Sequence, residues 1–224
     1  MRCVYVHGSG RTGAAAWPSV DPESGTFVAF EKNATVAERV TVLEARYAGE
    51  PAVLFAHSLG GVPAVLAVAG GILDVRALVL VEPALYDIAR GDAAIERHIA
   101  IWAEARSRAG LGDLRGFWAI VRPVMFGSPL DDSAWPEERG FAEQWAAAEL
   151  PWGHEVRSRM LRGTPTLVVT GGWNDEYEAI AEVLVRNGAF HHALPGAQHR
   201  PQDLPEFGPV VADFLRTVDA ASHS

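Results

Sequence analysis

Short, continuous apolar runs recur along the chain and lack the polar alternation of a half-exposed strand. Such runs are typical of strands covered on both faces, as in a parallel sheet flanked by helices. We expect strands at residues 3–6, 26–30, 52–56, 77–81, 166–170 and 190–194.

Helical periodicity fills several of the segments between these runs. Thr35 and Glu38 have the spacing of a capping box at the start of a predicted helix that extends to about residue 48. Residues 207–218 form a second apolar stripe at helical spacing. The alternation predicts an α/β fold: a mostly parallel sheet of about six strands with helices on both faces.

Residues 84–157 interrupt this alternation with three helical stretches, near 93–110, 113–127 and 139–150. We expect a helical cap subdomain over 84–157, inserted into a core formed by 1–83 and 158–224. Tryptophans are concentrated in the insertion, where helical spacing favours a core of its own over a ligand pocket. The five are Trp102, Trp118, Trp135, Trp145 and Trp152.

Composition narrows the possible classes of protein. A chain of 224 residues that is 49% hydrophobic can bury a sizeable core. The net charge of -9 argues against a nucleic-acid partner, and the single cysteine excludes a disulfide framework. The first ten residues do not resemble a signal peptide, and no apolar run reaches membrane-spanning length. We therefore expect a cytoplasmic protein with no membrane partner.

The stretch AVLFAHSLGG, residues 52–61, carries the first candidate for chemistry. A buried strand that enters a helix through a serine flanked by small residues is what a nucleophile elbow requires. Ser58 would then lie at a helix N-terminus, where the dipole favours negative charge. The motif by itself is equally compatible with a polar residue that simply ends a strand.

The stretch HGSG, residues 7–10, follows the first strand and leaves backbone N–H groups free to face one point. Acyl transfer needs such donors for its oxyanion, and we expect them to be the amides of Ser9 and Leu59. A phosphate loop is the competing interpretation, but the spacing of the glycines fits it poorly. His7 is expected to be structural.

The loop LPGAQHRPQ, residues 194–202, precedes the last helix and contains His199. Loops at the carboxyl ends of parallel strands carry reactive side chains in α/β folds. His199 is therefore the best general base among the eight histidines, and His57 is expected to point away from Ser58.

Two carboxylates follow predicted strands and could orient that histidine. Asp175 comes after residues 166–170, and Glu82 comes directly after 77–81. We rank Asp175 first and Glu82 second, although Asp175 could equally be an ordinary helix-capping residue.

The chain resembles the α/β-hydrolase superfamily, which places Ser, acid and His in this order along the sequence. The resemblance rests on the loop at His7–Gly8, the elbow at Ser58, Asp175 and His199. The resemblance covers nearly the whole chain. Ala56 stands where glycine is commoner, and the first strands of full-length members are missing, so the N-terminus is shortened. The exposed sheet edge makes a homodimer as plausible as a monomer.

This resemblance implies a serine hydrolase with the triad Ser58, Asp175 and His199. It implies that the substrates are carboxylic esters of small to medium size and apolar character. It also implies that the reaction needs no metal or organic cofactor. Lactonase, thioesterase, carbon–carbon hydrolase and perhydrolase activities use the same groups. Serine at position 58 argues against dehalogenases and epoxide hydrolases. A non-catalytic ligand-binding protein on this scaffold is the alternative from another class.

Overall fold

A parallel six-stranded sheet forms the centre of the computed structural model, which describes residues 2–222. All strand pairs are parallel, and the order across the sheet is β2-β1-β3-β4-β5-β6. The α/β prediction is therefore confirmed. The strands are β1 (Arg2–Val6), β2 (Thr26–Phe27), β3 (Ala52–His57), β4 (Val75–Val81), β5 (Thr166–Thr170) and β6 (Phe190–Ala193).

The helices follow from local sequence signals. The predicted capping box forms, because Thr35 accepts the Glu38 amide hydrogen and the Glu38 carboxylate accepts that of Thr35. Long helices lie at α1 (Val36–Tyr47), α2 (Gly61–Ala69), α3 (Ala93–Gly110), α4 (Leu114–Phe126), α5 (Trp135–Ala147), α6 (Asp175–Arg186) and α7 (Phe207–Ser222).

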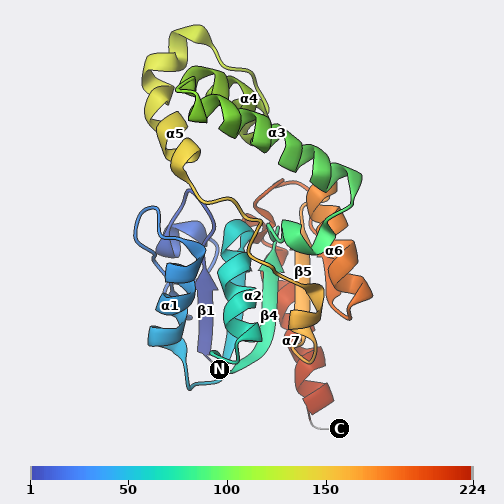
Figure 1. Ribbon diagram of the computed structural model, residues 1–224. Coiled ribbons are helices and arrows are strands. Elements are labelled where there is room, and N and C mark those ends of the chain that lie inside the picture. The colour runs from blue at the N-terminus through green and yellow to red at the C-terminus, as the bar shows by residue number, and fades with distance from the viewer. Residues whose placement is uncertain (1, 223–224) are drawn as a thin grey trace. The chain divides into compact units, whose positions relative to one another are not determined.

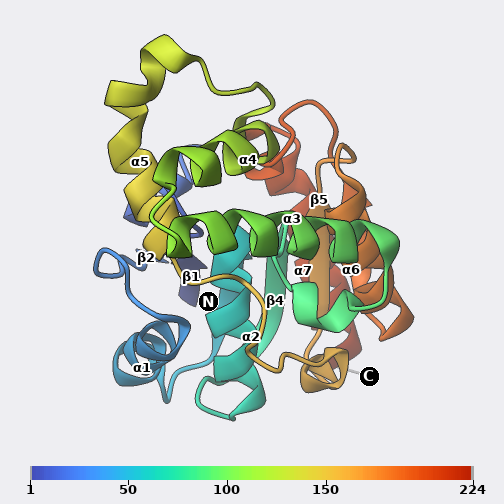
Figure 2. The same cartoon turned by 45° about the horizontal axis from the view of Figure 1, so that its top comes forward.

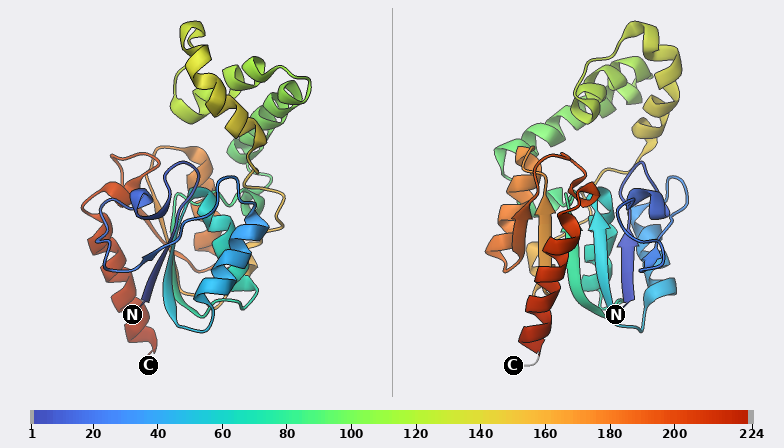
Figure 3. Two further views of the ribbon diagram at one scale, coloured as in Figure 1. Left: turned by 90° about the vertical axis from the view of Figure 1, so that its left-hand side faces the viewer. Right: turned by 180° about the vertical axis from the view of Figure 1, so that it is seen from behind.

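Helices cover both faces of the central strands β3, β4 and β5, which explains why their runs are apolar, whereas β6 at the edge is exposed along its length. Figure 1 shows α1 and α2 on the near side, and the right-hand view of Figure 3 shows α7 on the opposite side. Alternate strand residues such as Val53, Phe55 and Val79 pack with Phe214 of α7 and with Trp17. All six residues of β3 are buried, so its carboxyl end is held rigidly.

The chain divides into two compact units, Met1–Ala89 with Pro151–Ser224, and Arg90–Leu150. The insertion is therefore shorter at both ends than the predicted 84–157. Asp87 joins the two segments that flank the insertion within the first unit. Its carboxylate accepts the amide hydrogens of Gly153 and His154 at 2.8 and 2.9 Å. The ring of Tyr86 also contacts that of Trp152.

The second unit consists of α3, α4 and α5, with α3 and α4 side by side (Figure 2). Trp102 and Trp118 are buried within it, as expected for tryptophans that form a core of their own. The Trp118 indole donates to Glu138 at 2.6 Å, and Arg122 pairs with the same carboxylate. None of the helices in the described part of the chain is long and apolar enough to cross a membrane.

Candidate active site

Ser58 lies on a sharp turn between β3 and α2, as the elbow motif predicts. Its φ of 52° is in the left-handed region that non-glycine residues rarely adopt. Ser58 begins a short 3-10 turn, Ser58–Gly60, that leads directly into α2. The turn therefore separates Ser58 from both regular elements and places it at the carboxyl edge of the sheet.

The sheet register places Ser58 and Glu82 at equivalent positions on neighbouring strands. His57 pairs with Val81 across β3 and β4, and the two polar residues follow immediately. Glu82 is fully buried and also has a left-handed backbone, with φ of 44°. Burying a carboxylate costs free energy unless the carboxylate accepts hydrogen bonds. The donors around Glu82 therefore indicate its role.

The loop after β1 packs directly on this elbow. A Cβ on Gly8 would lie 2.9 Å from the Ser58 Cβ, and one on Gly60 would lie 2.5 Å from the His7 carbonyl oxygen. Only glycine permits both approaches. The close fit brings the segment at Ser9 next to the turn that carries Leu59, the two residues predicted to supply the oxyanion amides.

His199 faces Glu82 across the carboxyl edge of the sheet. Its Nδ1 lies 3.3 Å from the Glu82 Oε2. Because a carboxylate only accepts, a neutral imidazole here carries its proton on Nδ1, which leaves Nε2 free to accept a hydrogen bond. The same carboxylate accepts the Gly171 amide at 2.5 Å and the Trp173 indole at 3.0 Å.

The described geometry reverses our ranking of the two acids. Asp175 is the exposed first residue of α6, after the N-cap Asn174, and has no hydrogen bond or ion pair to His199. Glu82 follows β4, the strand next to that of Ser58, whereas Asp175 follows β5, one strand further away. Glu82 is therefore the carboxylate that contacts the histidine.

The loop that carries His199 is pressed against the end of β5. A Cβ on Gly171 would collide with the carbonyl oxygen of Gln198, the residue before His199. Gln198 has a φ of 47°. Of the five non-glycine residues with positive φ among those described, three are Ser58, Glu82 and Gln198, so backbone strain is concentrated around these groups.

His57 holds the loop that carries His199 through a hydrogen bond, and the sequence did not predict this role. Its Nε2 donates to the main-chain carbonyl of His199 at 2.9 Å, and the two rings lie 4.8 Å apart. Burial and the neighbouring His199 hold the pKa of His57 well below its ordinary value of 6.5. His57 is therefore a neutral donor and not a second base.

His7 is structural, as expected. Its Nδ1 donates to the Gly8 carbonyl at 2.7 Å, and its Nε2 accepts the Phe30 amide at 3.3 Å. Burial also lowers its pKa. Both ring nitrogens are thus used to fix the loop after β1, and neither is available for proton transfer.

Aromatic rings surround His199, and the sequence analysis did not select them either. The rings of Tyr177 and Trp173 have their centroids 5.0 and 6.4 Å from that of His199. Burial raises the pKa of the Tyr177 hydroxyl, and the carboxylates of Glu82 and Glu176 raise it further. Both aromatics lie in the segment around Asp175, at the end of β5 and the start of α6.

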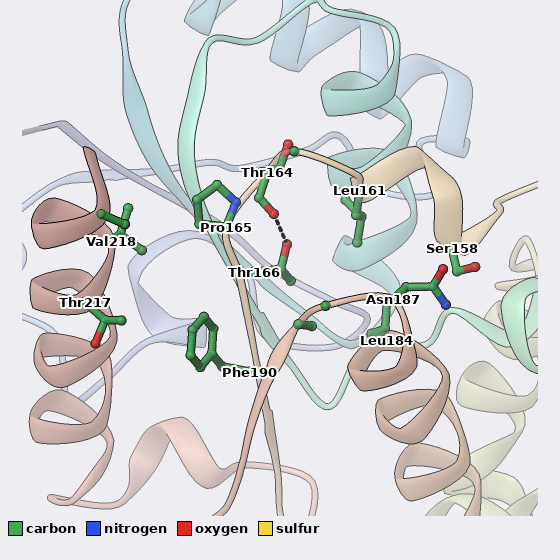
Figure 4. Close-up of a pocket in the computed structure, with 14 residues that line it drawn as sticks. Ser158, Leu161, Thr164, Pro165, Thr166, Leu184, Asn187, Phe190, Thr217 and Val218 are labelled. Carbon is green, nitrogen blue, oxygen red and sulfur yellow. Dashed lines mark hydrogen bonds between the residues drawn. The ribbon is translucent and has the colours of Figure 1, made fainter. Parts of the chain in front are cut away.

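A separate hollow of about 460 Å³ lies elsewhere on the first unit (Figure 4). Thr164 and Pro165, before β5, and Phe190, at the start of β6, belong to its lining. The amino ends of parallel strands lie at the opposite edge of the sheet from Ser58 and His199. This hollow is therefore distinct from the candidate active site. No group of three or more His, Cys, Asp or Glu side chains in the described residues could hold a metal ion.

Comparisons with known proteins agree on the architecture. No protein-family model matches the chain, and no curated protein matches it. Among solved structures, MenH from S. aureus superposes with a TM-score of 0.67 at 15% identity, over 97% of this chain and 94% of that one.

Two further structures give the same result. A carboxylesterase structure from the thaumarchaeon Nitrososphaera gargenis has a TM-score of 0.59 at 16% identity, over 98% of this chain and 91% of that one. MGS-M2, an alpha/beta hydrolase from a Medee basin deep-sea metagenome library, has a TM-score of 0.55 at 15% identity, covering 95% and 88%. Likeness at these identities concerns the fold, and the fold of this chain is that of the α/β hydrolases.

Proposed function

We propose that the protein is a serine hydrolase that cleaves carboxylic esters of small to medium apolar substrates through an acyl-enzyme. The observation that carries the proposal is the contact between His199 Nδ1 and Glu82 Oε2 beside a serine held on a strained strand-to-helix turn. This arrangement leaves one unprotonated imidazole nitrogen for the serine proton.

In the proposed mechanism, Ser58 Oγ attacks the ester carbonyl carbon while its proton passes to Nε2 of His199. Glu82 stabilises the imidazolium that forms, and the amides of Ser9 and Leu59 donate to the oxyanion. The imidazolium then protonates the departing alcohol. Water, deprotonated by His199, attacks the acyl-enzyme and releases the acid, which restores Ser58.

Two relationships support the convergence of Ser58 and His199. His57, which immediately precedes Ser58, holds the main chain of His199. Glu82, which the sheet register aligns with Ser58, contacts the ring of His199. The two reacting groups therefore share neighbours on both sides, although no hydrogen bond joins them directly among the described residues.

An apolar substrate is favoured by the rings that border these groups. Trp173 is 43% exposed although its ring lies against His199. Exposed aromatic surface beside reacting groups offers an acyl chain or an alcohol group a contact that water does not satisfy. Lactones and thioesters of similar size remain compatible with the same groups.

A fluorophosphonate probe tests the proposal, because it forms a covalent adduct only with an activated serine. We expect one adduct on the folded protein, located at Ser58 and abolished in Ser58→Ala. Ser24→Ala, in an exposed loop before β2, is the matched control and should label like the natural chain. Absence of an adduct at Ser58 would favour a non-catalytic ligand-binding protein.

Chromogenic esters of increasing acyl length then test the substrate class. We expect kcat/KM to rise from acetyl to medium acyl chains, and to fall by at least about 10³-fold in Ser58→Ala. Rates that are flat with chain length and insensitive to Ser58→Ala would contradict ester hydrolysis. A lactone and a thioester of matched size separate the related activities.

A further inference from the structure

Three nitrogen atoms surround the fully buried carboxylate of Glu82. The Gly171 amide donates to Oε1 at 2.5 Å, and the Trp173 indole donates to Oε2 at 3.0 Å. Nδ1 of His199 lies 3.3 Å from that same Oε2. Each carboxylate oxygen therefore accepts a donor from the loop after β5, and the indole shares its oxygen with the imidazole.

Packing fixes the direction of the Trp173 indole. A Cβ on Gly171 would lie 2.7 Å from Cδ1 of the indole, so the ring lies directly against the glycine main chain. The ring centroids of Tyr177 and His199 lie 6.2 and 6.4 Å from that of Trp173. Because Nε1 is bonded to Cδ1, these contacts turn the indole N–H toward the buried carboxylate.

The inward direction of this N–H is notable in a side chain that is partly exposed. Trp173 is 43% exposed, and an indole on the surface can donate to water instead. A hydrogen bond to a carboxylate is charge-assisted and stronger than one between neutral groups. The last torsion of a glutamate side chain has only a broad preference of its own, so one donor on each oxygen of Glu82 restricts that rotation.

The loop after β5 thus has a different task from the one that its sequence suggests. Its own carboxylate, Asp175, is exposed at the start of α6. The loop supplies instead the two donors, Gly171 and Trp173, that hold the acid of the neighbouring strand.

We propose that Trp173 is a positioning residue: its indole N–H fixes the rotation of the Glu82 carboxylate, so that Oε2 faces Nδ1 of His199. The role rests on the proposed serine chemistry, in which an imidazolium forms at His199. An acceptor that already points at Nδ1 needs no reorientation when this charge develops. Trp173 itself neither gives nor takes a proton in the reaction.

Trp173→Phe tests the role, because it keeps an aromatic face for the substrate and removes the N–H. We expect kcat for an ester to fall about tenfold, the factor for losing one hydrogen bond to a charged group. KM should stay within about twofold. Trp118→Phe is the matched control, because it also removes an indole donor from a carboxylate, that of Glu138 in the second unit, and kcat should not change.

A double-mutant cycle tests whether Trp173 acts through Glu82. In the Glu82→Gln background the charged acceptor is already lost, so Trp173→Phe should reduce kcat by less than about twofold. A tenfold loss in both backgrounds would mean that Trp173 supports the reaction by another route, and would overturn the proposal.

A readout without substrate reports the tautomer of His199. In protein labelled with heavy-nitrogen histidine, neutral His199 should give two widely separated ring resonances, as expected for a proton held on Nδ1. The separation should shrink in Trp173→Phe, because a carboxylate that rotates favours one tautomer less, and should persist in Trp118→Phe. Loss of a merely structural tryptophan would lower the free energy of unfolding and leave the tautomer of the folded protein unchanged.

A measurement on the natural chain serves if Trp173→Phe does not fold. The indole proton resonance of Trp173 should move upfield as His199 takes up its proton, because Oε2 then bonds more strongly to the imidazolium. The indole resonance of Trp118 should not follow this titration. A Trp173 resonance that stays constant while His199 titrates would mean that the two rings do not share Glu82.

Other titratable or charged groups near His199 do not change charge over this titration. Burial holds the pKa of His57 well below its ordinary value, and burial raises that of Tyr177. The Arg200 guanidinium is paired with the Asp203 carboxylate at 2.6 Å.

The outcomes distinguish the positioning role from the underlying chemistry. If the natural chain hydrolyses esters but folded Trp173→Phe keeps its kcat and its separated resonances, the role of Trp173 is wrong and the serine hydrolase stands. If the natural chain neither hydrolyses esters nor labels at Ser58, the hydrolase proposal fails. The resonances of His199 and Trp173 then decide by themselves whether the indole orients Glu82.

Discussion

The imidazole of His57 donates a hydrogen bond to the main-chain carbonyl of His199, 142 positions further along the chain. The residue immediately before the candidate nucleophile thus fixes the backbone of the candidate base. The elbow therefore contacts the loops of both partners of the proposed proton transfer, and not that of the serine alone.

Replacing His57 by leucine should impair catalysis without removing any reacting group. The His199 carbonyl loses its donor, so we expect kcat for an ester to fall about tenfold, with a smaller change in KM. The free energy of unfolding should fall by about 1 to 3 kcal/mol. Steady-state kinetics and urea unfolding measure the two effects, and a variant with unchanged kcat would show that His199 is held by other contacts.

Stability should decrease as pH falls below about 6.5. The folded-state pKa of His57 lies below its ordinary value of 6.5, so the unfolded chain takes up protons first as pH falls. The stabilising effect is complete above the unfolded pKa and decreases between the two values, by up to about 1.4 kcal/mol per pH unit. His7 adds a contribution of the same sign.

Urea unfolding at a series of pH values from about 5 to 8 measures this slope. His57→Leu should have a shallower dependence, because the leucine takes up no proton in either state. Equal slopes in the two proteins would mean that His57 is not kept neutral by the fold.

Glu82→Gln should reduce kcat by about 10³-fold or more, because the amide cannot stabilise the imidazolium of His199. Asp175→Asn is the matched control, and its effect should stay within about twofold, since Asp175 is an exposed residue in the first turn of α6. Kinetics with one ester decide between the two acids. A larger loss in Asp175→Asn would restore our original ranking.

Gly60 and Gly61 are neighbours with different requirements. Gly60→Ala should be destabilising by about 1 to 3 kcal/mol, because its Cβ would lie 2.5 Å from the His7 carbonyl oxygen. Gly61→Ala should be close to neutral, because its nearest contact is an ordinary 3.5 Å to Pro83 and its φ is -62°. Thermal unfolding of the two variants tests the difference, and equal midpoints would contradict the tight packing of the loop on the elbow.

The amino-acid sequence by itself determined the strands, the long helices and the local chemistry of the elbow. Continuous apolar runs predicted the sheet because strands buried on both faces tolerate few polar side chains. The small residues around Ser58 predicted its turn because larger ones would collide with the strand and helix that the turn joins. These are requirements of neighbouring residues, so a local pattern reveals them.

Only the tertiary structure decided which groups meet. Glu82 and Asp175 have the same local signal, a carboxylate after a buried strand. Strand order and register distinguish them, because β4 lies next to β3 and aligns Glu82 with Ser58. The donor role of His57 and the contacts of Tyr177 likewise depend on loops far apart in the chain. Such contacts arise when the sheet assembles, and no local pattern encodes them.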